Sequence, residues 1–131
     1  MPRAKELKIR VENRPGMLGE VASVLAEQKI NLRAVNAWVE SGQGVIRLVT
    51  DKLPAARKAL SKRGWSPEEE EVLEVELADK PGTLARLATA LGQAGIDIRH
   101  VYVGNAGARK ATVFMGVSDL AAALKAARAV R

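Results

Sequence analysis

The chain contains two copies of one sequence unit, and this internal repeat limits the folds that it can adopt. Residues 14–18 (RPGML) return 66 positions later as residues 80–84 (KPGTL). Residues 30–33 (INLR) return at the same offset as residues 96–99 (IDIR). Several matches in the same order indicate two modules with one fold.

Hydrophobic periodicity predicts the elements of these modules, which we place at residues 1–68 and 69–131. Apolar and charged residues alternate from Leu7 to Val11, as in a half-buried strand. Apolar residues recur at helical spacing from Leu18 to Leu25. The first module is predicted to have strands at residues 7–11, 31–39 and 45–50, helices at 18–25 and 53–62, a hairpin turn at 41–44 and a left-handed helix end at Gly64.

The predicted order is strand, helix, strand, strand, helix, strand, which defines the fold class. Two split βαβ crossovers interleave to give an antiparallel sheet with both helices on one face. We therefore expect an α+β protein of two ferredoxin-like βαββαβ modules in tandem.

The junction and the end of the chain depart from a perfect repeat. Residues 65–67 form at most a short fourth strand of the first module, and the acidic run at 68–71 is expected to be a solvated linker. Residues 104–107 are expected to form a hairpin turn. We expect the second module to lack its last strand, because only Arg131 follows a predicted helix at 120–130. The open edge of its first strand, residues 72–78, should be covered by the first module or by a second chain.

Composition excludes several kinds of chemistry. Cysteine is absent and His100 is the only histidine, so thiolate and multi-histidine metal sites cannot form. No nucleophile, phosphate-binding or dinucleotide motif is present. There is no apolar run of membrane-spanning length and no signal peptide. We expect a cytoplasmic protein that is not an enzyme and holds neither a metal nor a cofactor.

The net charge of +6 is uneven along the sequence and raises the question of nucleic acid. Residues 1–66 hold 13 Lys and Arg against 6 Asp and Glu, whereas residues 67–131 hold 8 against 9. Aromatic residues do not interleave with basic ones, because the chain has only Trp38, Trp65, Tyr102 and Phe114. A solvated basic face is therefore favoured over a nucleic-acid interface.

Both repeats resemble the ACT domain, the amino-acid-sensing module of metabolic regulation. Residues 12–18 (ENRPGML) and 30–32 (INL) carry the resemblance, which locally is strongest to the regulatory domain of phosphoglycerate dehydrogenase. Residues 78–84 (ADKPGTL) and 96–98 (IDI) fit the same pattern less closely. The whole chain is similar to stand-alone proteins made of two ACT domains.

The resemblance implies a ligand site between two modules placed side by side. One wall is the loop between the first strand and the first helix, and the other is the start of the second strand of the neighbouring module. The implied residues are Asn13, Gly16, Met17, Leu18 and Asn31 in the first module, and Asp79, Gly82, Thr83, Leu84 and Asp97 in the second.

The chemistry of these residues suits an amino acid. A Pro-Gly turn that opens a helix offers backbone N–H groups and the positive end of the helix dipole to a carboxylate. Side-chain oxygens of Asn and Asp can accept hydrogen bonds from an ammonium group. Trp38 could line the ligand cleft, and Thr83 could instead be a helix N-cap. The dehydrogenase family has a histidine two residues before the Asn. This chain has Val11 and Leu77 at the corresponding positions.

We therefore expect a regulatory protein that binds an amino acid, pairs into a homodimer and signals through a partner. One alternative is a dissociable regulatory subunit of an amino-acid biosynthetic enzyme, such as an acetohydroxyacid synthase. A second alternative is a structural or nucleic-acid-binding module that uses its basic first copy.

Overall fold

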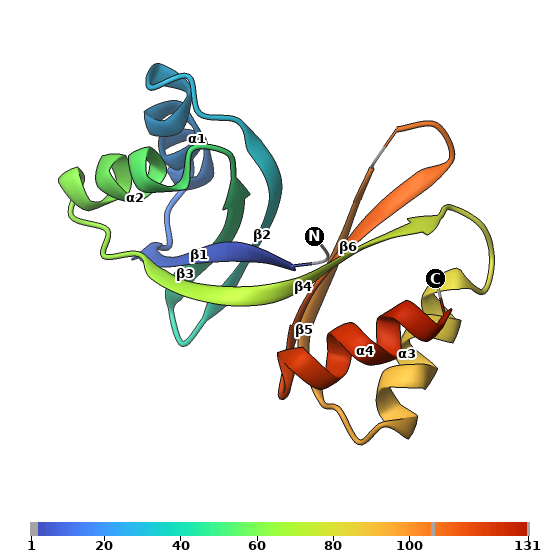
Figure 1. Cartoon of the computed structure of the whole chain (residues 1–131). Helices are drawn as coiled ribbons and strands as arrows, with labels where there is room; N and C mark the ends of the chain where they lie inside the picture. Colours follow the sequence, from blue (N-terminus) through green and yellow to red (C-terminus); the bar gives the residue numbers. More distant parts are fainter. Residues whose placement is uncertain (1–2, 106, 131) are drawn as a thin grey trace. The chain divides into compact units, whose positions relative to one another are not determined.

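The structure is a computed structural model that describes residues 3–105 and 107–130. It divides into two compact units (Figure 1). The N-terminal unit comprises Lys5–Glu70. The C-terminal unit comprises residues 71–131 together with the first four residues of the chain.

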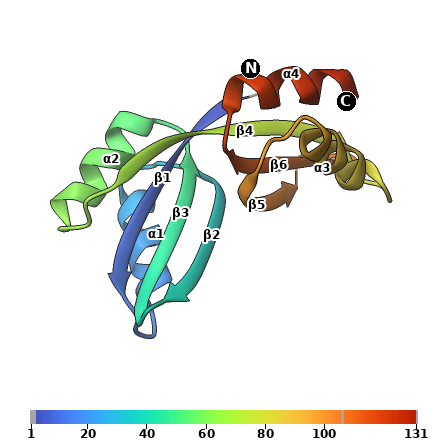
Figure 2. The same ribbon diagram turned by 90° about the horizontal axis from the view of Figure 1, so that it is seen from below.

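The N-terminal unit is a sheet with both of its helices on one face (Figures 1 and 2). Three of its strands lie in the order β2-β3-β1, and each neighbouring pair is antiparallel. Its elements are β1 (Arg3–Glu12), α1 (Met17–Glu27), β2 (Leu32–Glu40), β3 (Gln43–Thr50), α2 (Leu53–Lys62) and the first residues of β4 (Glu68–Ala78).

Alternation along the strands builds the core of this unit. Leu7, Ile9 and Val11 of β1 point to the helix side, where they are at most 5% exposed. They pack with β3 residues and with Val21, Leu25 and Leu60 of the two helices. Burial of side chains of this kind, about 1.5–3 kcal/mol each, holds the helices on the sheet.

The C-terminal unit repeats this arrangement with the strand order β4-β6-β5. Its further elements are α3 (Thr83–Gln93), β5 (Ile98–Asn105), β6 (Lys110–Val117) and α4 (Leu120–Val130). Leu73, Val75 and Leu77 of β4 occupy the places that β1 residues hold in the other unit, and they pack with Leu87 and Leu91 of α3. None of the described helices is long and apolar enough to span a membrane.

The predicted α+β tandem of ferredoxin-like modules is confirmed, including the turn that starts each first helix. Gly16 and Gly82 occupy the N-cap positions of α1 and α3 with φ angles of 85° and 91°. This left-handed conformation is easy for glycine and costly for other residues. Gly64, with φ of 85°, ends α2 as predicted.

Two expectations about loops are wrong. The acidic run is not a linker, because Glu68 begins the 11-residue strand β4. Residues 65–67, which were expected to form at most a short strand, form none. Gly104 and Asn105 belong to β5 rather than to a turn, while Ala106 of that expected turn lies outside the described residues.

Ion pairs explain why so acidic a segment is ordered as a strand. Glu69 lies 3.5 Å from Lys5 and is also paired with Arg57 of α2. The hydrogen bond from Arg57 lowers the pKa of Glu69. Opposite charges on neighbouring elements thus offset the repulsion within the run.

The edge of β4 that was expected to be open in the second module lies beside the first residues of β1. No strand follows α4 within the described part of the C-terminal unit. Arg3 and Ala4 at the start of β1 belong to this unit, and Arg3 lies 3.5 Å from Glu71 at the start of its part of β4.

Two glycine substitutions three residues apart should change stability in opposite directions. Gly16→Ala should lower the free energy of unfolding by about 1–2 kcal/mol, because alanine resists the left-handed conformation. Gly19→Ala should raise it by about 0.5–1 kcal/mol, because Gly19 is an exposed helical residue with open space around it. Urea unfolding of both variants measures this difference, and equal effects would contradict it.

Candidate functional site

A cavity of about 220 Å³ lies in the N-terminal unit, where the loop between β1 and α1 meets the hairpin of β2 and β3. It brings together three predicted site residues: Asn13, Met17 and Leu18. Gly16 belongs to the same loop without lining the cavity. The lining residues are Val11, Glu12, Asn13, Arg14, Met17, Leu18, Ala37, Trp38, Val39, Gly44, Val45 and Ile46.

Strand register explains why these segments converge. Glu12 at the end of β1 and Glu40 at the end of β2 are both paired with Gln43 at the start of β3. The loop after Glu12 therefore begins beside the hairpin. Gly44 lets the two sides come close, because a Cβ there would lie 3.0 Å from the Val11 side chain.

The first turn of α1 presents backbone donors beside this cavity. The N–H of Met17 donates to the carbonyl of Arg14 at 3.3 Å, and that of Glu20 donates to Gly16 at 2.9 Å. Within the described residues, the N–H groups of Leu18 and Gly19 have no acceptor. Such groups at a helix N-terminus favour an anion such as a carboxylate.

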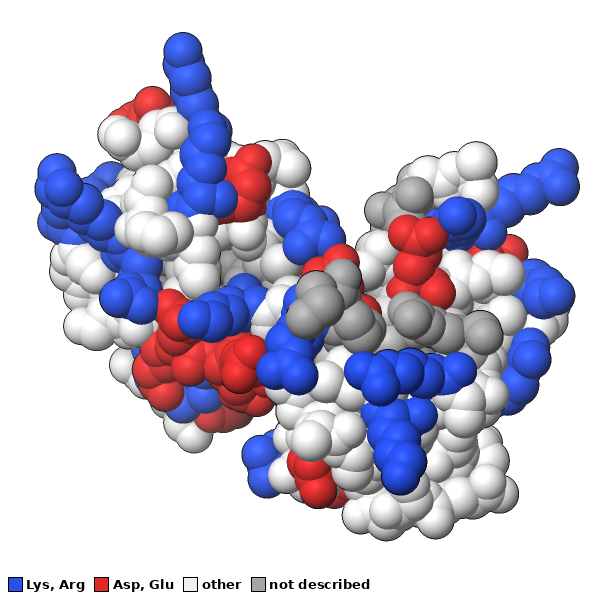
Figure 3. Space-filling view, viewed as in Figure 1, with Lys and Arg blue, Asp and Glu red and all other residues white. Residues whose placement is uncertain are grey.

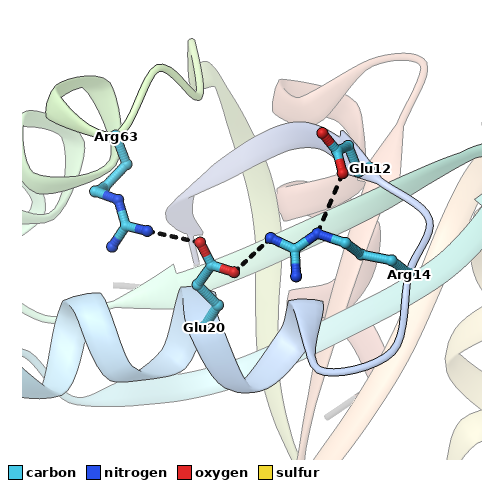
Figure 4. Close-up of polar contacts among 4 residues, drawn as sticks. All are labelled: Glu12, Arg14, Glu20 and Arg63. Atoms are coloured by element: carbon cyan, nitrogen blue, oxygen red, sulfur yellow. Dashed lines mark hydrogen bonds and ion pairs between the residues drawn. The ribbon is translucent and has the colours of Figure 1, made fainter.

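An ionic brace holds the loop against the two helices (Figure 4). Arg14 reaches Glu12 at 3.1 Å and Glu20 of α1 at 2.7 Å, and Glu20 reaches Arg63 at 2.6 Å. The hydrogen bond to Glu20 raises the pKa of Arg14. Because Glu12 and Arg14 are paired with each other, the two charged residues that line the cavity neutralise one another.

The side chain of Trp38 lies on the sheet face away from the helices, because Trp38 alternates along β2 with Ala37 and Val39, which are paired with Ile46 and Gly44 on the helix face. Its indole is held there from two sides. The indole N–H donates to a Glu40 carboxylate oxygen at 3.3 Å, and this bond lowers the pKa of Glu40. The Arg47 guanidinium lies 5.6 Å from the centre of the ring, within cation–π range. Arg47 is itself paired with the buried carboxylate of Glu6.

The corresponding cavity of the C-terminal unit is larger, at about 640 Å³, and has a different lining. Of the predicted residues only Asp79 lines it; Gly82, Thr83 and Leu84 do not. The lining residues are Asp79, Val103, Gly104, Gly107, Ala108, Arg109, Lys110 and Ala111.

Thr83 has a local structural role. Its hydroxyl donates to the carbonyl of Ala78 at 2.8 Å, which ties the start of α3 to the end of β4. The alternative that Thr83 is the N-cap is wrong, because Gly82 occupies that position and no side chain caps the helix.

Asn31 and Asp97 lie away from the cavities of their own units. Each precedes a second strand at the sheet end opposite the loop: Leu32 is paired with Thr50, and Ile98 with Val117. The N–H of Asn31 donates to Asp51 and that of Asp97 to Ser118, both at 2.9 Å. Their assignment to the opposite wall of another module's site stays a prediction.

The chain consists of two βαββαβ modules in tandem. In the N-terminal module, the loop before the first helix borders a cavity. The ACT domain family model matches residues 5–62 and again residues 72–131. This chain is therefore a member of the ACT domain family, and membership supports a regulatory role in amino-acid sensing.

Several solved structures share the fold over nearly the whole chain. Protein BT0572 from Bacteroides thetaiotaomicron is 28% identical with a TM-score of 0.89, and the alignment covers 98% of this chain and 88% of that one. The regulatory subunit of aspartate kinase from Thermus thermophilus is 20% identical with a TM-score of 0.69, covering 98% and 92%. A putative C-terminal regulatory domain of aspartate kinase from Porphyromonas gingivalis is 16% identical with a TM-score of 0.56, covering 98% and 93%. No curated protein matches this chain.

Glu20→Gln should loosen the loop without unfolding the protein. Loss of the carboxylate charge weakens both ion pairs of the brace, so amide hydrogens of Asn13, Arg14 and Gly16 should exchange several-fold faster. The free energy of unfolding should fall by less than about 1 kcal/mol, because these pairs are partly exposed.

Glu27→Gln on the same helix is the matched control, since Glu27 makes no ion pair within the described residues. Hydrogen exchange followed by mass spectrometry measures the difference. Equal exchange in both variants would show that the brace does not order the loop.

Proposed function

We propose that this protein is a regulatory module that binds a free amino acid in the cavity of its N-terminal unit and acts through a partner protein. The observation that carries the proposal is the convergence of the backbone N–H groups at the start of α1, Asn13 and an apolar wall that includes Met17, Ala37 and Val39. These three features suit the carboxylate, the ammonium group and the side chain of an amino acid.

Family membership supports the same class of ligand. Among the described residues, no group of three or more His, Cys, Asp or Glu residues could hold a metal ion. Signalling then requires a partner that distinguishes the ligand-bound protein from the ligand-free protein. The ligand and the partner would change each other's affinity by the same factor.

We propose an enzyme of amino-acid metabolism as the partner. The Thermus thermophilus neighbour is described as a regulatory subunit of aspartate kinase, which is an example of this fold in a separate regulatory chain. The alternative of a regulatory subunit for an acetohydroxyacid synthase belongs to the same class, and co-purification with a large catalytic chain would identify either.

A homodimer remains part of the proposal. Strands β2 and β5 stand at sheet edges, and each unit exposes apolar side chains on or beside its edge strand. These residues are Leu18, Val35 and Val39 in the N-terminal unit and Leu84, Val101 and Val103 in the C-terminal unit, each 41–57% exposed. Apolar surface repeated in this way favours association.

The charge of the folded N-terminal unit, residues 5–70, gives less support to nucleic-acid binding than the charge of residues 1–66 in the sequence. The acidic start of β4 lies in the N-terminal unit, so residues 5–70 hold 12 Lys and Arg against 9 Asp and Glu. Figure 3 shows this acidic band among the basic side chains of that unit. Phosphate backbones require a more continuous basic surface.

Thermal unfolding against a panel of standard amino acids at millimolar concentration tests the proposed function. An amino acid at about 100 times its dissociation constant should add about 2.7 kcal/mol of stability, which raises the unfolding temperature by several degrees. Asn13→Ala should reduce this shift, whereas Ser23→Ala on the exposed surface of α1 should leave it unchanged. A flat panel would contradict amino-acid sensing.

A further inference from the structure

A groove of about 400 Å³ lies between α1 and α2, which pack side by side on one face of the N-terminal sheet (Figures 1 and 2). It is separate from the loop cavity, because the two share no lining residue. Its apolar lining consists of Val24 of α1 and of Ala55 and Ala59 of α2. The two alanines are one helical turn apart, and their short side chains leave space that larger side chains would fill.

The charged side chains of this groove are divided between its two sides. Glu27 lies on the α1 side, whereas Lys58 and Lys62 lie on the α2 side. Arg63 also lines the groove, but it is paired with Glu20 at 2.6 Å. Within the described residues, Glu27, Lys58 and Lys62 make no ion pair and are exposed. Their charges are therefore available to a partner.

The spacing of the two lysines matches a helix. Lys58 and Lys62 are four residues apart in α2, so their side chains lie one turn apart on the same side of the helix. A second helix that packs along α2 presents the same spacing when it carries two acidic residues four positions apart. From Ala55 to Lys62 the α2 side of the groove is about 10 Å long, which corresponds to about two turns of such a helix.

The C-terminal unit has a groove at the same place but with different charges. This groove of about 380 Å³ between α3 and α4 is lined by Ala85, Arg86, Thr89, Ala90, Gln93 and Val130. The offset of 66 residues aligns Val24 with Ala90 and Glu27 with Gln93. Arg86 is the one charged side chain in the described lining of the second groove. The groove itself therefore follows from the fold, whereas the division of charge belongs to the N-terminal unit.

We infer that the groove between α1 and α2 is a docking surface for an amphipathic helix of the partner protein. The apolar side of that helix packs on Val24 and on the two alanines of α2. Two acidic residues one turn apart pair with Lys58 and Lys62, and a basic residue on the opposite side of the helix faces Glu27. This complementarity of charge selects the partner and fixes the direction in which its helix lies. The inference rests on the proposed function, which requires a partner, and adds the surface that recognises it.

A synthetic peptide tests this docking surface on the ¹⁵N-labelled full chain. The peptide is a stapled helix of about four turns with an apolar stripe, two glutamates one turn apart on one side of the stripe and an arginine on the other. In a nuclear magnetic resonance titration it should shift the amides of α1 and α2 and leave those of α3 and α4 unchanged. Binding should weaken several-fold as the salt concentration rises, because exposed charges are screened.

Reversal of the charges on both partners makes the test specific. Lys58→Glu combined with Lys62→Glu should weaken binding of the peptide about tenfold or more. A second peptide, with lysines in place of the glutamates and a glutamate in place of the arginine, should bind this double variant more tightly than it binds the unmodified chain. Lys125→Glu combined with Arg128→Glu is the matched control, since it reverses two exposed charges on α4 outside both grooves.

The possible outcomes separate this inference from the proposed function. Absence of peptide binding, or equal losses in the two double variants, would overturn the docking surface, while the amino-acid panel still decides ligand binding. A change of oligomeric state in the Lys58 and Lys62 double variant, measured by sedimentation, would assign the groove to a second copy of this chain and also overturn the inference. Intact peptide binding with a flat amino-acid panel would contradict amino-acid sensing and leave the docking surface standing.

Discussion

The left-handed glycine after the first strand of each unit is the constraint on which the rest of the structure depends. At Gly16 and Gly82 the chain leaves an extended strand and enters a helix within a few residues. Without this reversal α1 and α3 could not return across their sheets, and their apolar faces could not cover β1 and β4. At Gly16 the same reversal places the unbonded N–H groups of the first turn of α1 beside a cavity. A conformational requirement of the fold therefore also creates the end of the candidate site that favours an anion.

Much of the fold could be predicted from local patterns, because each pattern records a local preference. Alternation from Leu7 to Val11 predicted a strand, helical spacing from Leu18 predicted a helix, and Gly64 predicted a helix end. The acidic run at Glu68 was misjudged because its order depends on Lys5 and Arg57. Lys5 is 64 positions from Glu69, and Arg57 is 12 positions away on another element, so the acidic run itself contains neither partner.

The candidate site also has one part that local sequence predicted and one part that it did not. Asn13, Met17 and Leu18 follow from the loop motif, since one short segment carries all three. The opposite wall depends on the register of β1, β2 and β3, which local sequence does not specify. Gly44 was a usable signal, because a glycine inside a strand often marks a close approach of another segment. No feature of the sequence indicated the cation–π contact of Arg47 with Trp38.

We propose that an amino acid binds in the loop cavity of the N-terminal unit. The most direct test is a nuclear magnetic resonance titration of the ¹⁵N-labelled full chain with the amino acid that raises its unfolding temperature most. The largest shifts should occur at the amides of Asn13, Leu18 and Gly19. Shifts confined to the groove between α1 and α2, which Lys58 and Lys62 line, would contradict this proposal.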